Sequence, residues 1–170
     1  MKGALIVVDM QNDFIFGSLG SAEAEKILAP LKARIQAARK AGDDVIFTRD
    51  THGKEYLSTP EGKKLPVPHC IKGTEGHELA DGLYIEGAKL IDKPTFGSFE
   101  LAEYVKKQGY AKVELVGVCT DICVVSNALL IKTTCPETEV AVNAALTAGT
   151  SKEAHEAALL TMRSCQVEIV

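Results

Sequence analysis

Residues 113–132 read VELVGVCTDICVVSNALLIK, and this stretch indicates the fold. The apolar run Val113–Val116 is typical of a buried strand. The segment Gly117–Asp121 breaks the run, and an apolar stretch from about Asp121 to Lys132 then has the length of a buried helix. A strand that passes through a short turn into a covering helix is the repeating unit of a parallel α/β sheet.

The same alternation of strands and helices is predicted along the rest of the chain. Further strands are expected at Ala4–Val8, Val45–Thr48, around Leu90–Ile91, at Val140–Val142 and at Gln166–Ile169. Helices are expected at about Ala24–Ala41, Phe99–Gln108 and Lys152–Arg163. The interval from Asp50 to Gly76 has no clean period and is predicted to be a long loop with one helical turn. No proline- or serine-rich linker divides the chain, so residues 1–170 are predicted to form one α/β domain, a parallel sheet with helices on both faces.

The composition is that of a globular protein with a full hydrophobic core. Hydrophobic residues make up 46% and charged residues 25% of the 170 positions, which argues against disorder. The formal net charge of −4 makes nucleic acid an unexpected partner. The apolar stretch Ile122–Ile131 is about half as long as a membrane span, so no membrane association is expected. The five cysteines lack the paired spacing of a disulfide framework, which indicates reduced thiols and a cytoplasmic protein.

Polar side chains follow four of the predicted strands. Asp9 ends the first strand, and Asp50 and His52 follow the second. Lys93 follows the third strand, and the segment Cys119–Cys123 follows the fourth. Ligands of open parallel sheets bind beyond the carboxyl ends of the strands. We therefore expect a carboxylate, a pair of metal ligands, an ammonium group and a thiol to meet at one edge of the sheet.

Cys123 is the candidate nucleophile of this edge. It lies near the start of a predicted helix, where unpaired N–H groups and the helix dipole favour the thiolate. An adjacent Lys93 would lower the pKa of the thiol further, and Asp9 could accept the thiol proton and return it to a leaving group. The alternative is that Cys123 is a small buried hydrophobic residue, as free cysteines often are. The expected proximity of Asp9 and Lys93 favours the nucleophile.

Asp50 and His52 form a second candidate site, for a metal ion. They are two residues apart in TRDTH, so their side chains can converge on one ion if the segment is not a regular strand. His69 comes from the proline-rich segment LPVPHC, and Glu61 lies between the two segments. An aspartate with two histidines is a competent open site for zinc, manganese or iron. Two other histidines are predicted to lie on the surface or to cap a helix: His77 and His155.

Five motifs match, in order, a known protein family. They are VVDMQNDF (7–14), TRDTH (48–52), PVPHCIKGTEG (66–76), DKPTFGSF (92–99) and GVCTDICV (117–124). The chain resembles the isochorismatase-like cysteine hydrolases, and within them most of all the metal-containing nicotinamidase branch. The resemblance implies a Rossmann-like three-layer domain with a six-stranded parallel sheet in the order 3-2-1-4-5-6. Many members of the family are dimers or tetramers, so a homodimer or homotetramer is expected.

The resemblance also assigns catalytic roles to residues of this sequence. Asp9 would be the general acid and base, and Lys93 the charge that stabilises the thiolate and the transition state. Cys123 would be the nucleophile, as the last cysteine of the TDxC motif. A cis peptide bond is implied between Val118 and Cys119. The backbone N–H groups of Cys119 and Cys123 would then form an oxyanion hole.

A metal ion and a ring pocket are implied in the same way. The ion would be one divalent zinc, manganese or iron, and the aligned ligands are Asp50, His52, His69 and, at a fourth position that varies, Glu61. Phe14 and Phe96 are the candidate ring platforms of the substrate pocket. Nicotinamidases of the family often carry an aromatic residue three positions before the metal-loop histidine. This chain has Pro66 there, so one stacking partner is expected to be missing.

The implied reaction is hydrolysis of a small carboxamide through a thioester acyl-enzyme. Nicotinamide, giving nicotinate and ammonia, is the best candidate substrate. Another amidohydrolase of the family, acting on a carbamoyl or ureido compound, is the first alternative. A thiol redox switch formed by Cys119 and Cys123 is the second, although a C-x-x-x-C spacing is not the usual redox motif. A silent binding protein is disfavoured because all three triad positions are filled. The other cysteines are predicted to be structural or incidental: Cys70, Cys135 and Cys165.

Overall fold

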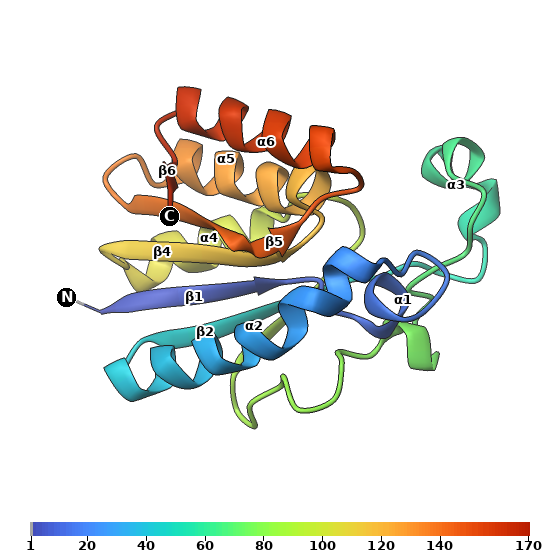
Figure 1. The fold of residues 1–170 in the computed structure, drawn as a ribbon, viewed down its shortest axis with the longest axis horizontal. Coiled ribbons are helices and arrows are strands. Elements are labelled where there is room, and N and C mark those ends of the chain that lie inside the picture. The colour runs from blue at the N-terminus through green and yellow to red at the C-terminus, as the bar shows by residue number, and fades with distance from the viewer. Residues whose placement is uncertain (1) are drawn as a thin grey trace.

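In the computed structural model, which describes residues 2–170, the strands form one sheet in the order β3-β2-β1-β4-β5-β6 (Figure 1). All five strand pairs are parallel. This confirms the predicted sheet and its order. The strands are β1 (Gly3–Val8), β2 (Asp44–Asp50), β3 (Lys89–Lys93), β4 (Lys112–Val118), β5 (Glu139–Ala148) and β6 (Glu168–Ile169).

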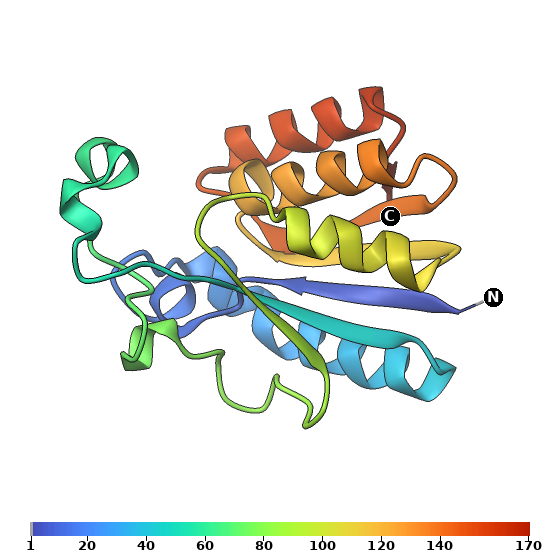
Figure 2. The same ribbon diagram turned by 180° about the vertical axis from the view of Figure 1, so that it is seen from behind.

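Helices cover both faces of the sheet, as Figures 1 and 2 show from opposite sides. One face is covered by the long helix α2 (Ala22–Ala41), with the short α1 (Asn12–Ile15) at its start. The other face is covered by α4 (Phe99–Gln108), α5 (Val125–Thr134) and α6 (Lys152–Ser164). A short helix, α3 (Pro60–Lys64), lies in a lobe beyond the carboxyl ends of the strands (Figure 1).

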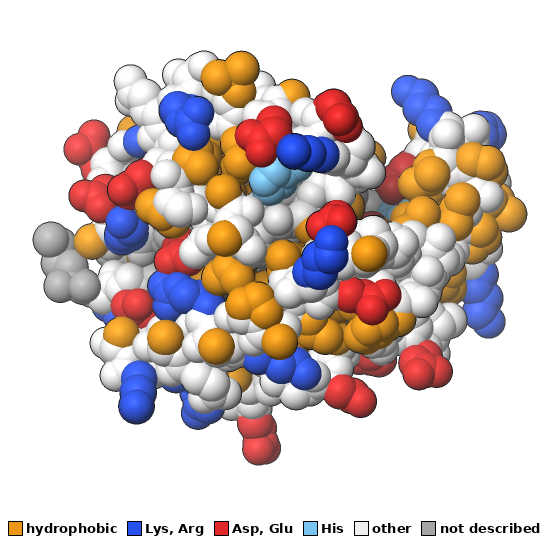
Figure 3. Space-filling model, in the orientation of Figure 1, with side chains coloured by type: hydrophobic (Ala, Val, Ile, Leu, Met, Phe, Trp, Pro, Cys, Tyr) orange, Lys and Arg blue, Asp and Glu red, His pale blue; other side chains and the backbone are white. Residues whose placement is uncertain are grey.

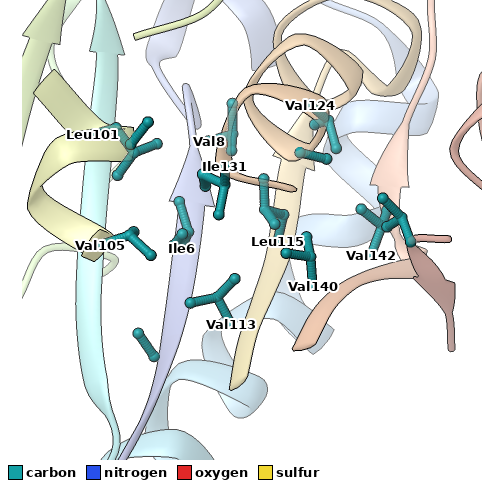
Figure 4. Close-up of a cluster of buried hydrophobic side chains, with 14 of the residues drawn as sticks. Ile6, Val8, Leu101, Val105, Val113, Leu115, Val124, Ile131, Val140 and Val142 are labelled. Carbon is teal, nitrogen blue, oxygen red and sulfur yellow. The ribbon is translucent and has the colours of Figure 1, made fainter. Parts of the chain in front are cut away.

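The central strand β1 shows how the sequence builds the two layers of the core. Because side chains alternate across a strand, Ile6 and Val8 point into the cluster under α4, α5 and α6 (Figure 4). Leu5 and Val7 point into the cluster under α2. A strand that is buried on both faces needs an unbroken apolar run, and Ala4–Val8 supplies one.

Three segments differ from the predictions. β5 is longer than Val140–Val142, because it continues to Ala148 after a shift in its register with β4. The first residues of the helix predicted from Asp121 form a π-helical turn, Thr120–Val124, and α5 begins only at Val125. The long loop contains α3 and the two 3-10 turns Tyr56–Ser58 and Glu75–His77, instead of one helical turn.

The sheet places its functional side chains at one end. The carboxyl ends of β1, β2, β3 and β4 are neighbours. Asp9 and Cys119 directly follow β1 and β4, and Asp50 and Lys93 are the last residues of β2 and β3. Among residues 2–170, no helix combines the length and the apolar sequence that a membrane crossing requires.

Candidate active site

Asp9, Lys93 and Cys123 lie together at the carboxyl end of the sheet. The Lys93 Nζ is 2.6 Å from the Asp9 Oδ2 and 3.4 Å from the Cys123 Sγ. The side chains of Lys93 and Asp9 are fully buried, and Cys123 is 5% exposed. Three strand ends thus deliver a carboxylate, an ammonium group and a thiol to one point, which is the arrangement that the sequence predicted.

Asp9 is held in place by β2. Its backbone φ is 50°, a left-handed conformation that is uncommon outside glycine and that marks functional sites. The Thr48 hydroxyl donates to the Asp9 Oδ1 at 2.6 Å, and the Asp9 backbone N–H donates to the Thr48 carbonyl at 3.2 Å. Thr48 therefore orients the carboxylate toward Lys93. Thr48 could not be predicted as a site residue, because no motif marks a threonine inside a strand.

The charges of the three groups are set by burial and by one another. Burial raises the pKa of the Cys123 thiol well above its ordinary value, and the Asp9 carboxylate raises it further, against the effect of Lys93. Burial also raises the pKa of Asp9, again opposed by Lys93. Burial alone would lower the pKa of Lys93, but Asp9 and Cys123 outweigh it, so the pKa of Lys93 is raised. Burial and the Asp9 charge therefore oppose the thiolate that the helix terminus and Lys93 were predicted to favour.

The turn after β4 presents two backbone donors beside the thiol. The peptide bond between Val118 and Cys119 is cis, as the resemblance implied. Gly117, with φ 111°, allows β4 to pass close to β1 here, because a Cβ at this position would lie 2.1 Å from the Val8 carbonyl oxygen. Among residues 2–170, the Cys119 N–H donates no hydrogen bond, and the Cys123 N–H donates none to a group outside the Thr120–Val124 turn. The two N–H groups lie at the turn that carries the thiol, where the resemblance implied an oxyanion hole.

Asp50, His52, Glu61 and His69 form a second group, with ligand atoms that all lie within 4.8 Å of one another. The Asp50 Oδ2 is 2.9 Å from the His52 Nε2 and 3.5 Å from the His69 Nε2. Burial would raise the pKa of Asp50, but hydrogen bonds with both histidines and the charge of Lys93 outweigh it and hold that pKa far below its usual range.

This group fits a divalent transition metal. The His69 Nδ1 lies 2.8 Å from the Val67 carbonyl, an interaction that fixes the tautomer and leaves the Nε2 free to bind a metal. The Asp50 Oδ1 is buried and has no hydrogen-bond partner among residues 2–170, and the Lys93 Nζ lies 3.6 Å from it, so a bound cation could supply the partner that this oxygen lacks. Two imidazoles and two carboxylates are a ligand set that suits zinc, manganese or iron.

Gln11, which was not predicted as a site residue, holds the backbone of Asp50. Its Oε1 accepts from the Asp50 N–H at 2.7 Å, and its Nε2 donates to the carbonyls of Asp50 at 2.8 Å and His77 at 2.9 Å. His77 is consequently buried, with 2% exposure, and its Nε2 is 2.8 Å from the Thr51 hydroxyl. The predicted surface position of His77 is wrong, because its partners come from distant segments of the chain.

The other predicted residues are placed as follows. His155 is partly buried in the first turn of α6, and its Nδ1 is 2.8 Å from the Thr120 hydroxyl, so it braces the turn that carries the thiol and does not cap a helix. All five cysteines are free. Cys70 and Cys135 are buried, Cys165 is exposed, and Cys119 is partly exposed in the cavity described next.

A cavity of about 480 Å³ opens onto the thiol. Figure 3 shows the surface hollowed between the lobe of α3 and the rest of the domain. Phe14 and Phe96 line the cavity, as predicted for ring platforms, and Leu65 lines it where Pro66 had been expected. Asp50, Glu61 and His69 also line the cavity, so the metal group and the thiol share it. Among the described residues, no lysine or arginine lines it.

A family model described as the isochorismatase domain matches residues 3–170. The chain belongs to the isochorismatase family. A nicotinamidase/pyrazinamidase of Mycobacterium tuberculosis is 32% identical over 183 aligned residues, which cover 98% of this chain and 97% of that protein. This similarity agrees with the predicted nicotinamidase branch of the family.

Two solved structures of the isochorismatase fold bear on the site. The pyrazinamidase of Pyrococcus horikoshii, crystallised in complex with zinc, has a TM-score of 0.87 and 31% identity, and the match covers 100% of this chain and 99% of that one. The N-carbamoylsarcosine amidase of Thermoplasma acidophilum has a TM-score of 0.84 and 26% identity, and the match covers 99% of this chain and 95% of that one.

Proposed function

We propose that this chain hydrolyses a small, uncharged carboxamide, and that nicotinamide is the best candidate. The observation that carries the proposal is the contact of the buried Asp9 and Lys93 with Cys123, whose thiol opens onto a cavity that Phe14 and Phe96 line. The similarity to nicotinamidases, with 32% identity over nearly the whole chain, supports the same activity.

The first half of the reaction forms a thioester. Asp9 accepts the proton of the Cys123 thiol while the sulfur attacks the carbonyl carbon, so that the carbonyl oxygen becomes an oxyanion. The backbone N–H groups of Cys119 and Cys123 stabilise this oxyanion. The tetrahedral intermediate collapses, the carbon–nitrogen bond breaks, and Asp9 returns the proton to the departing ammonia. The raised pKa of Asp9 suits a group that both accepts and returns a proton.

The second half releases the acid. Water attacks the thioester carbonyl and gives a proton to Asp9, and the oxyanion forms again against the same N–H groups. The carbon–sulfur bond breaks, the carboxylic acid leaves, and Asp9 returns the proton to the Cys123 sulfur. Lys93 keeps its charge throughout, since its pKa is raised, and stabilises the negative charge that moves between Asp9 and the sulfur.

The metal group is proposed to hold one divalent ion on Asp50, His52 and His69, with Glu61 as the fourth ligand. When bound, the ion would supply a Lewis acid that orients the ring nitrogen of the substrate or polarises a water. The chain's own residues do the rest: Gln11 fixes the Asp50 backbone, and Phe14 packs beside His69 with ring centroids 5.5 Å apart.

The cavity favours a neutral amide over a carbamoyl amino acid. A substrate such as N-carbamoylsarcosine carries a carboxylate, which needs a cationic partner when it is buried. No lysine or arginine of the described chain lines the cavity, and the charges of Asp50 and Glu61 would neutralise a divalent ion bound between them, which leaves no net positive charge for the carboxylate. The alternative substrate class is therefore less well matched. The enzyme is further proposed to act in the cytoplasm, as a homodimer or homotetramer.

Ammonia release from a panel of small amides tests the proposal. The panel contains nicotinamide, benzamide, N-carbamoylsarcosine and a short aliphatic amide. Hydrolysis of nicotinamide that Cys123→Ala abolishes and Cys119→Ala largely preserves is the expected result, because only the backbone of Cys119 has a role. Preferential release from N-carbamoylsarcosine would contradict the substrate class. Equal loss in both variants would contradict the assigned nucleophile.

A further inference from the structure

The segment between β3 and α4 carries a wall of the cavity on a short connection. It runs from Pro94 to Ser98, passes the start of α5 and leads into α4 (Figure 2). Phe96 lines the cavity from this segment, but its side chain is 43% exposed, so packing alone does not fix the ring. The position of the Phe96 ring therefore depends on how the backbone on either side of it is held.

Two side chains tether that backbone. The Lys93 Nζ donates to the Thr95 carbonyl at 3.0 Å. The amide of Asn127, in α5, accepts from the Ser98 N–H at 2.9 Å and donates to the Phe96 carbonyl at 3.1 Å. The carbonyls or N–H groups of three of the residues from 95 to 98 are thus fixed by groups outside the segment.

Asn127 also contacts the nucleophile. Its Nδ2 donates to the Cys123 carbonyl at 2.8 Å, so one buried amide uses both of its N–H groups and its oxygen, and it bridges Cys123 and Phe96. Such a fully satisfied amide, with 0% exposure, fixes the geometry of the groups that it joins. A helix does not need an asparagine at this point, since asparagine is a weak helix former.

We propose that Asn127 is a positioning residue that holds Phe96 in register with the Cys123 thiol, and that it thereby sets the affinity for aromatic over aliphatic amides. The inference deepens the proposed function and rests on it for the kinetic assay. Asn127 touches no substrate. It acts through the Phe96 ring, which lies over the cavity where the ring of an aromatic amide would bind.

The test uses Asn127→Thr. A threonine hydroxyl can still donate to the carbonyl four residues earlier, here that of Cys123, but it does not reach both partners in the segment from 94 to 98. KM for nicotinamide should rise by about two- to tenfold, the range of one aromatic contact, with little change in kcat. KM for an aliphatic amide should not change. The matched control is Asn143→Ala, which removes an asparagine of β5 that bonds Glu114 outside the cavity.

A double-mutant cycle separates positioning from a general loss of stability. If Asn127 acts through Phe96, then Asn127→Thr should raise KM no further in a Phe96→Ala background. Additive effects, or equal increases for the aromatic and the aliphatic amide, would overturn the proposal.

A second measurement does not depend on activity. The chain contains no tryptophan, so Phe96→Trp introduces a single tryptophan on the wall of the cavity, which can be excited selectively over the four tyrosines. The fluorescence anisotropy of this residue should fall when Asn127→Thr or Asn127→Ala is added, and it should stay the same when Asn143→Ala is added. An unchanged anisotropy in folded Asn127 variants would overturn the proposal even if the protein hydrolyses a different amide, and a fall would support it whatever the substrate.

Discussion

Replacing Lys93 by methionine should strongly destabilise the protein, because the ammonium group is the shared partner of two buried carboxylates. Its Nζ is 2.6 Å from the Asp9 Oδ2 and 3.6 Å from the Asp50 Oδ1. The side chains of Lys93 and Asp9 are 0% exposed and that of Asp50 is 5% exposed. Methionine has a similar length but no charge, so Lys93→Met leaves both carboxylates without a cation.

The expected size follows from this burial. Removing one partner of a buried ion pair costs about 3–5 kcal/mol, since the remaining charge is left uncompensated. For a domain of this length, each kcal/mol corresponds to about 2–4 °C in Tm, so the Tm should fall by roughly 6–20 °C. The control is Lys89→Met on the same strand. Lys89 pairs with Glu100 at 2.9 Å, but the side chains are 34% and 59% exposed, and solvent-accessible pairs contribute about 0–1 kcal/mol.

Urea unfolding of chelator-treated protein measures the difference. Lys93→Met should lose several times more free energy of unfolding than Lys89→Met. Adding Asp9→Asn to Lys93→Met should recover part of the loss, because one of the uncompensated carboxylates is then gone. A free energy of unfolding for Lys93→Met within about 1 kcal/mol of the wild type would refute the reasoning, since an exposed pair costs no more than that.

Four further predictions follow from the same geometry. Leu65→Phe should lower KM for nicotinamide in steady-state kinetics, whereas Pro66→Phe should not, because only Leu65 lines the cavity; the reverse order would place residue 66 over the substrate. Thr48→Val should lower kcat/KM by about tenfold, since it removes the hydrogen bond to the Asp9 Oδ1, and Thr48→Ser should not. His52→Ala should reduce metal content from one ion per chain in elemental analysis; an unaltered content would exclude the site. Burial would raise the pKa of Asp44, but hydrogen bonds from Lys2 and Tyr110 outweigh it and lower that pKa. The carboxylate therefore stabilises the fold above its unfolded pKa of 3.8, and this stabilisation is lost as the pH falls through the folded-state pKa. In urea unfolding at several pH values, Asp44→Asn should weaken the loss of unfolding free energy at acidic pH.

Periodicity and strand-end residues predicted the sheet, its helices and the meeting of Asp9, Lys93 and Cys123. These succeed because the carboxyl ends of parallel strands are neighbours whatever the loops do. The length of β5 was missed because residues 143–145, Asn-Ala-Ala, have no β-branched character and lie where the register with β4 shifts, between Val142 and Thr147.

The supporting residues could not be read from local sequence. Gln11, Thr48 and Asn127 act through hydrogen bonds to residues that lie 29 to 66 positions away, apart from the bond of Asn127 to Cys123. The same holds for His77, whose burial depends on Gln11 and Thr51. Leu65, and not the predicted Pro66, lines the cavity. The Tyr56 hydroxyl, from a 3-10 turn, donates a hydrogen bond to the Leu65 carbonyl at 2.9 Å and holds this residue in place.

Trapping the acyl-enzyme tests whether Cys123 is the nucleophile that forms a thioester with the substrate. Wild-type protein is mixed with nicotinamide, quenched with acid during turnover, and measured by intact and peptide mass spectrometry. We expect a mass increase that corresponds to one pyridinecarbonyl group in place of one hydrogen, located on Cys123. The adduct should be absent from Cys123→Ala and present in Cys119→Ala. Rapid turnover of nicotinamide by Cys123→Ala, or an adduct on any other cysteine, would contradict it.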